Sequence, residues 1–181
     1  MNNATKKYIL IAVLVVPFLY LLYKLILVGA NDPIKYIFTL TGTTAMFMLI
    51  ATTMLSVIKL TKYRKILGLG AFCYALLHFV NFIILDAELD IEFIIKESLD
   101  KPFIYLGMLS FFILAFMATT STKNGFKKHS KKHKIIYLAI LLVIVHFIMG
   151  QKTITIEHWW YLLIFIVVIG VKGKILLSKD Y

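Results

Sequence analysis

Hydrophobic residues are gathered into six long runs, which are separated by short polar stretches. The runs lie near residues 8–28, 34–58, 66–85, 103–120, 135–150 and 158–177. A helix of roughly 20 apolar residues crosses a hydrocarbon core of about 30 Å, so each run suits a membrane span. The first run is too long for a signal peptide and lacks a small-residue cleavage site, so we expect it to remain as a span. The pattern predicts an all-α, polytopic membrane bundle of six transmembrane helices, forming one domain over residues 1–181.

Composition excludes a water-soluble domain. Hydrophobic residues make up 61% of the chain and charged residues 16%, with a mean hydropathy of +0.89. A soluble domain of this length has too little interior to bury so much apolar surface. The net charge of +11 would suggest nucleic acid in a soluble protein, but no basic domain interleaved with aromatic residues is present. We therefore expect contact with membrane lipid and no nucleic-acid binding.

The charged residues divide between the two ends of the runs. Fifteen of the 20 basic residues fall on one side, with Asp180 as its only acid: Lys6, Lys7, Lys59, Lys62, Arg64, Lys65, Lys123, Lys127, Lys128, Lys131, Lys132, Lys134, Lys172, Lys174 and Lys179. The other side holds four lysines and eight acids: Lys35, Lys96, Lys101, Lys152, Asp32, Asp86, Glu88, Asp90, Glu92, Glu97, Asp100 and Glu157. The positive-inside rule then predicts that the N and C termini are both cytoplasmic.

Two histidines, His78 and His146, lie inside predicted spans, where ionisable residues are costly and mark functional sites. Both spans run from the basic side to the acidic side, and both histidines lie past the midpoint. His78 is about 21 Å along its helix from Arg64. Two imidazoles at one depth on parallel helices suit the two axial positions of a haem iron, with the small residues Ala71 and Ala75 leaving room for a flat ring. The alternative is that each histidine only bonds a neighbouring helix.

A second level lies nearer the basic side, where Arg64 shares a helical face with His78. His133 precedes His146 by about 3.6 turns, so an ideal helix would place these two histidines on different faces. His133 is then either an interface residue or, if the helix start is distorted, a ligand. Arg64 together with His133 would suit an anionic cofactor group or a place where electrons enter. His129 and His158 lie at the predicted membrane edges, and we interpret both as solvated.

Several stretches resemble the ferric-reductase-like transmembrane superfamily and, within it, the MsrQ family of haem-binding membrane subunits. They cover about residues 40–175 in the expected order: Arg64 to Phe72 leading to His78, Lys101 to Ile104, Ala118 to Thr122, and His133 to Tyr137 leading to His146. An arginine at position 64, where other superfamily members have a histidine, is similar to MsrQ. The resemblance implies a multi-pass protein of the bacterial inner membrane.

The resemblance also implies an activity. Electrons would pass from the quinone pool, or from reduced flavin, through haem b to a periplasmic methionine-sulfoxide reductase subunit containing molybdopterin, for repair of oxidised proteins. The axial ligands of the haem iron would be His78 and His146, and FMN is a candidate second cofactor. The chain itself would be an electron-transfer subunit, not catalytic on sulfoxide alone.

Three other functions stay open at this point. One is another ferric-reductase-like haem carrier with a different partner. A self-contained reductase or oxidase is disfavoured, because only four residues follow the last run and no Gly-rich nucleotide loop is present. A small transporter or scaffold without haem is disfavoured because no acid lies within a span.

Overall fold

The computed structural model describes residues 2–58, 60–151 and 155–177, and every regular element among them is helical. The long helices are α1 (Asn3–Tyr23), α2 (Pro33–Val57), α3 (Arg64–Asn81), α5 (Pro102–Thr119), α7 (Ile136–Gly150) and α8 (Ile156–Leu177). The shorter elements are η1 (Lys24–Val28), η2 (Thr61–Tyr63), η3 (Phe82–Asp86), α4 (Ile91–Asp100), α6 (Lys123–His129) and η4 (Lys132–Ile135). The predicted all-α class is confirmed.

Five helical segments are long and apolar enough to cross a membrane. They are Ala4–Val28, Pro33–Leu55, Thr61–Asp86, Pro102–Thr119 and Lys132–Gly150, which match the first five predicted spans. The sixth predicted span is a helix too, α8, but its apolar stretch among the described residues, His158–Val168, is shorter. A sixth crossing therefore stays a prediction.

Local chemistry explains where the helices begin. The Asp32 carboxylate accepts a hydrogen bond from the Lys35 N–H at 2.9 Å, and Pro33 occupies the first position of α2. Pro102 likewise opens α5.

Inside α2, threonine hydroxyls donate to backbone carbonyls one turn earlier, as Thr41 does to Ile37 at 2.6 Å. Such a bond satisfies the donor of the hydroxyl in an apolar environment.

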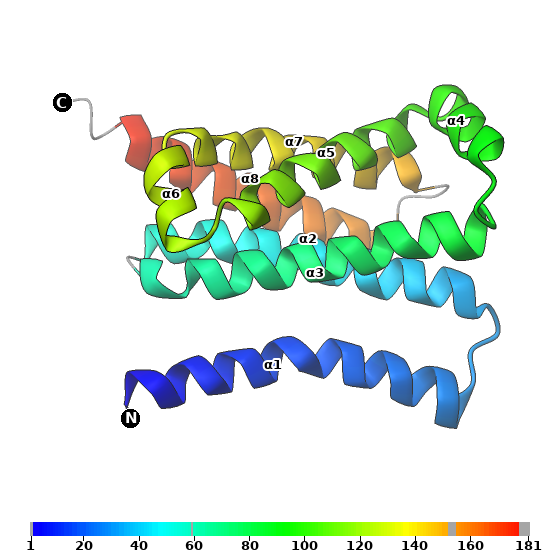
Figure 1. Cartoon of the computed structure of the whole chain (residues 1–181), viewed down its shortest axis with the longest axis horizontal. Coiled ribbons are helices and arrows are strands. Elements are labelled where there is room, and N and C mark those ends of the chain that lie inside the picture. Colours follow the sequence, from blue (N-terminus) through cyan, green and yellow to red (C-terminus); the bar gives the residue numbers. More distant parts are fainter. Residues whose placement is uncertain (1, 59, 152–154, 178–181) are drawn as a thin grey trace.

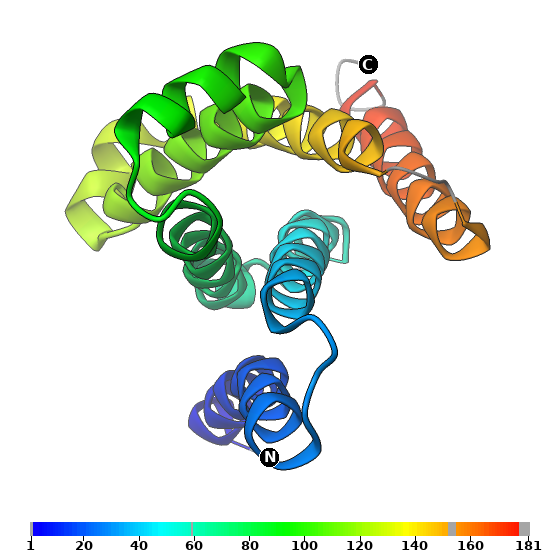
Figure 2. The ribbon, with the colours of Figure 1, turned by 90° about the vertical axis from the view of Figure 1, so that its right-hand side faces the viewer.

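The long helices run nearly parallel to one axis and form an open ring when viewed end-on (Figures 1 and 2). Around this ring α2 packs against α3, α3 against α5, α5 against α7, and α8 against α2. Helix α1 stands outside it, beside α2 and α3, and the Tyr74 hydroxyl donates to the Leu14 carbonyl at 2.8 Å. Helix α6 and the first turn of α3 lie at one end of the molecule, here called the basic end. The other end, which carries α4 and the α1–α2 connection, is called the acidic end (Figure 1).

The densest packing lies in the half of the bundle nearer the basic end. Its core joins residues of α2, α3, α5, α7 and α8: Met46, Met48, Leu49, Ile50, Ala71, Tyr74, Ile113, Leu114, Ile136, Ala139, Ile140 and Val168. Ala71 and Ala139 are fully buried in it. Side chains as small as these let neighbouring helices approach closely in a membrane. The histidines lie beyond this core, toward the acidic end.

The polar stretch between the third and fourth predicted spans contains helix α4, which the hydrophobic pattern did not indicate. Asp90 caps it by accepting a hydrogen bond from the Phe93 N–H at 3.0 Å. In the end-on view α4 lies across the end of α5, against which it packs (Figure 2). Helix α4 matters for the site because its residue Glu97 lines the cavity described below.

Candidate functional site

His78 projects from α3 toward α2 and is held there by a backbone carbonyl. Its Nδ1 lies 3.1 Å from the Phe38 carbonyl oxygen. Its ring rests on Gly42, where an added Cβ would come within 3.0 Å of the imidazole Cε1 and Nδ1. The Phe38 ring stands edge-on to the imidazole, with centroids 5.2 Å apart.

His146 repeats this arrangement on the opposite side of the bundle. It projects from α7 toward α5, and its Nδ1 lies 2.6 Å from the Phe103 carbonyl oxygen. Its ring rests on Gly107, where an added Cβ would lie 2.8 Å from Cε1 and Nδ1. In both pairs the carbonyl belongs to the residue four positions before the glycine. The two histidines are thus held by equivalent contacts on two different helix pairs.

These contacts determine which ring nitrogen is available. A carbonyl oxygen can only accept, so Nδ1 of His78 and of His146 carries the hydrogen. Nε2 of each neutral imidazole then keeps its lone pair, as in histidines that bind metals. The structure therefore leaves a ligating nitrogen on each of the two rings.

The structure brings the two imidazoles together, as their shared depth predicted. Their centroids lie 6.1 Å apart and their planes are inclined at 86°. Two imidazoles on opposite sides of one metal ion have ring centres roughly 6 Å apart, because each metal–nitrogen bond is about 2 Å long. The spacing fits an iron atom bound between the rings. That His78 and His146 bind a haem iron stays a prediction.

The imidazoles face a cavity of about 450 Å³, within the usual range for a cofactor site. Its walls combine small residues such as Ala75 and Val143 with the aromatic rings of Phe79, Phe111 and Phe147. Ala71, also expected beside the ring, is instead buried in the core. No group of three or more His, Cys, Asp or Glu side chains suited to a bare metal ion occurs in the described part of the chain. Two imidazoles alone suit a metal whose other ligands come from a macrocycle.

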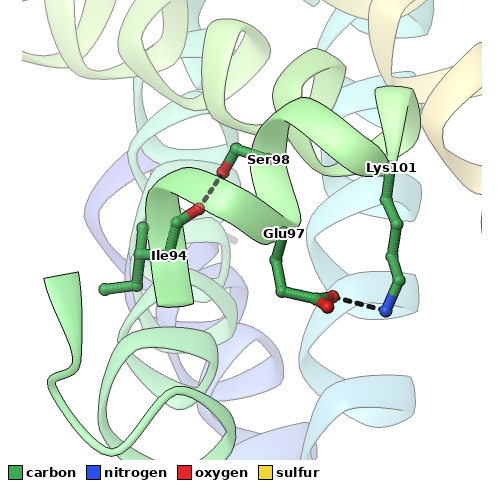
Figure 3. Close-up of polar contacts among 4 residues, drawn as sticks. All are labelled: Ile94, Glu97, Ser98 and Lys101. Atoms are coloured by element: carbon green, nitrogen blue, oxygen red, sulfur yellow. Dashed lines mark hydrogen bonds and ion pairs between the residues drawn. The ribbon is translucent and has the colours of Figure 1, made fainter. Parts of the chain in front are cut away.

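The cavity becomes polar toward the acidic end. Its lining there includes Asp86, Glu97, Lys101, Gln151 and His158. Lys101 forms an ion pair with Glu97 one turn earlier, and the two side chains lie beside the end of α4 (Figure 3).

His158 was interpreted as solvated, and the structure corrects this. The imidazole is half-buried, lines the cavity, and packs against the Phe147 ring with centroids 5.5 Å apart. The Thr155 N–H donates to its Nδ1 at 2.9 Å. His129, also expected to be solvated, is half-buried with Nδ1 3.1 Å from the Gly125 carbonyl oxygen.

Near the basic end, Arg64 and His133 lie close enough for the guanidinium charge to act on the imidazole. His133 belongs to the 3₁₀ turn η4, a distorted helix start, and its Nε2 is 2.9 Å from the Thr120 hydroxyl. Arg64 Nε and the Tyr63 hydroxyl are buried without hydrogen-bond partners among the described residues. A buried donor without a partner is costly, so these two donors suit an acceptor group that the protein does not supply. That Arg64 and His133 bind an anion stays a prediction.

The residues that hold the histidines were not predicted from the sequence. They are Gly42, Gly107 and the carbonyls of Phe38 and Phe103. A signal for the glycines was present, because glycine within a membrane span commonly marks a close approach by another group. No sequence pattern could have identified the carbonyl partners, since every residue of a helix carries one.

Comparison with known proteins gives matches over most of the chain. The family described as ferric reductase like transmembrane component matches residues 9–144. Relatives from Brucella ovis and Brucella canis are each 37% identical over 132 residues, and a relative from Brucella melitensis biotype 2 is 38% identical over 132 residues. All three are named protein-methionine-sulfoxide reductase heme-binding subunit MsrQ. The alignments cover 67% of this chain, which spans 60% of the length of these curated relatives. No solved structure matches the chain.

Proposed function

Because the chain belongs to the ferric-reductase-like transmembrane family, we propose that it conducts electrons through a haem b whose iron is bound by His78 and His146. The observation that carries the proposal is the pair of imidazoles 6.1 Å apart. When bound, the haem would supply a one-electron redox centre. Everything else in the mechanism is positioning by this chain.

The protein's part is to present two neutral imidazoles in a dry slot. The Phe38 and Phe103 carbonyls accept the Nδ1 hydrogens, which fixes the tautomer and makes Nε2 a stronger donor to iron. The packed core around Ala71 and Ala139 closes the slot toward the basic end. Low polarity around a redox centre influences its potential and limits access by water.

Electrons would cross from the cytoplasmic side to the outer side of the bacterial inner membrane. The positive-inside rule supports this orientation, because the basic end carries most of the lysines. Electrons would enter near Arg64 and His133 and come from quinol or reduced flavin. Two buried donors without partners, Arg64 Nε and the Tyr63 hydroxyl, support an anionic group there, such as the phosphate of FMN.

At the acidic end the electrons would pass to a separate catalytic protein. The named relatives belong to a protein-methionine-sulfoxide reductase system. We therefore assign as partner a periplasmic methionine-sulfoxide reductase subunit carrying molybdopterin, which repairs oxidised proteins as a heterodimer with this chain. The chain would not reduce sulfoxide alone.

Absorbance spectroscopy of the purified protein tests the haem assignment. The wild-type protein should show a low-spin b-type spectrum, which His78→Ala and His146→Ala should each abolish. His158→Gln is the matched control, because this histidine lines the same cavity while its Nδ1 accepts from Thr155. An unchanged spectrum in both alanine variants would contradict the proposal.

A further inference from the structure

We infer that Gly42 and Gly107 are positioning residues, which hold the two imidazole planes nearly perpendicular to each other. The inference rests on the proposed ligation of haem by His78 and His146. It adds a geometric property of the centre, the angle between its two axial ligands.

The angle originates in one contact pattern that occurs twice. The imidazole of His78, from α3, lies against Gly42 of α2, and its Nδ1 points at the carbonyl of Phe38 in the same helix. The imidazole of His146, from α7, lies against Gly107 of α5, and its Nδ1 points at the carbonyl of Phe103 in the same helix. Each ring therefore has two fixed contacts on a helix other than its own.

Glycine is needed because of where the carbonyl lies. In a helix, the carbonyl of residue i accepts the N–H of residue i+4 and keeps a second lone pair. The side chain at i+4 would normally cover that side of the turn. Gly42 and Gly107 stand four residues after Phe38 and Phe103, so both carbonyls stay open to an imidazole.

A methyl group at either glycine would displace the ring. An added Cβ would lie 3.0 Å from the His78 ring at Gly42 and 2.8 Å from the His146 ring at Gly107. Both separations are shorter than ordinary carbon contacts, which are about 3.5–4.0 Å. The imidazole would have to tilt or withdraw, and its bond to the carbonyl would lengthen. The angle of 86° between the two rings would then change.

The angle has a spectroscopic signature. Each axial imidazole interacts mainly with the iron dπ orbital perpendicular to its plane. If the two ring planes are perpendicular, each dπ orbital interacts with one imidazole, and the two orbitals stay nearly equal in energy. If the planes are parallel, both imidazoles interact with the same dπ orbital, and the two orbital energies separate. Low-spin ferric haem with nearly equal dπ orbitals gives one strongly anisotropic EPR feature at high g, and separated orbitals give a rhombic signal with three resolved features.

EPR of the oxidised, haem-loaded full chain tests the inference. The wild-type protein should give the strongly anisotropic low-spin signal, and Gly42→Ala and Gly107→Ala should each convert it to a rhombic or high-spin signal. Gly68→Ala is the matched control, because its Cβ would only reach Thr52 Cγ2 at 3.7 Å. If a variant fails to fold, the EPR signal of the wild-type protein still tests the angle of 86° between the two imidazole planes.

A wild-type protein with a bis-histidine absorbance spectrum and a rhombic EPR signal would overturn the inference while leaving the proposed function intact. The anisotropic signal persisting in both folded alanine variants would also overturn the role of the glycines. Failure of the wild-type protein to bind haem at all would overturn the proposed function and this inference with it.

Discussion

Ala71 and Ala139 are both fully buried, and each lies seven residues before the histidine of its own helix. Seven residues are about two helical turns, or about 10 Å, so each alanine is on the same face as its histidine. The packed core around these alanines meets the cavity at Met46, Leu49 and Leu114, which belong to both. The two alanines therefore locate the boundary between the packed half of the bundle and the half that holds the histidine pair.

Replacing either alanine by a larger residue should disturb the packing of this core. Ala71→Leu or Ala139→Leu inserts a bulky side chain into a filled core, and we expect a loss of about 1–3 kcal/mol of stability. Thermal unfolding in detergent, together with the haem content of the purified protein, measures the effect. Leu141→Ala, an exposed position on the same helix as Ala139, is the control and should change little. Unchanged melting in both leucine variants would contradict close packing here.

Helix α1 should depend on the Tyr74 hydroxyl for part of its attachment. Tyr74→Phe removes the hydroxyl that donates to the Leu14 carbonyl at 2.8 Å. We expect a loss of about 0.5–1.5 kcal/mol, with the haem spectrum retained because Tyr74 does not line the cavity. Protease sensitivity of the N-terminal helix and thermal unfolding measure it. Tyr105→Phe, at an exposed ring on α5, should behave like wild type; an equal loss there would show that the contact with Leu14 is unimportant.

Most of the fold could be predicted because long apolar runs are determined locally. The histidine pair could be predicted as well, since counting turns from Arg64 places His78 at a definite depth. Helix α4 was not predicted because its short, acidic sequence from Ile91 resembles a polar loop. Its packing against α5 is a tertiary contact, which the local sequence does not show. The environment of His158 was missed for a related reason: its burial depends on how the first turn of α8 packs against Phe147, a tertiary contact that sequence spacing does not contain.

Variants at the basic end should separate electron input from haem binding. His133→Ala and Arg64→Met should each slow reduction by quinol or reduced flavin, by tenfold or more, while the b-type spectrum remains. The reason is that Arg64 and His133 lie beyond the packed core, away from the His78–His146 pair. Stopped-flow absorbance of the haem measures the rate.

Two controls sharpen this test. Lys65→Met removes an exposed charge next to Arg64 and should leave the rate unchanged. Thr120→Val removes only the hydroxyl 2.9 Å from His133 Nε2, so it should have a smaller effect than removing the imidazole. Normal reduction kinetics in His133→Ala would make this histidine purely structural.

A further prediction concerns the end of the molecule at which electrons leave. The cavity reaches the polar side chains of the acidic end, where the proposed soluble partner would approach a bound haem closely. Protein reduced by dithionite should be reoxidised rapidly by a periplasmic methionine-sulfoxide reductase subunit plus sulfoxide, and hardly by sulfoxide alone. Rapid reoxidation by sulfoxide without a partner would mean that the chain is itself the reductase, and the conduit proposal would have to be abandoned.

Charge on α4 should influence the same reaction. Glu92 is exposed on this helix, so Glu92→Lys should weaken attraction to a basic surface of the partner and slow reoxidation, most clearly at low salt. Lys96→Gln, also at an exposed position of α4, makes the helix more acidic and should not slow the reaction. Equal slowing by both substitutions would show that α4 contributes through its structure, and a rate independent of both would place the partner away from α4.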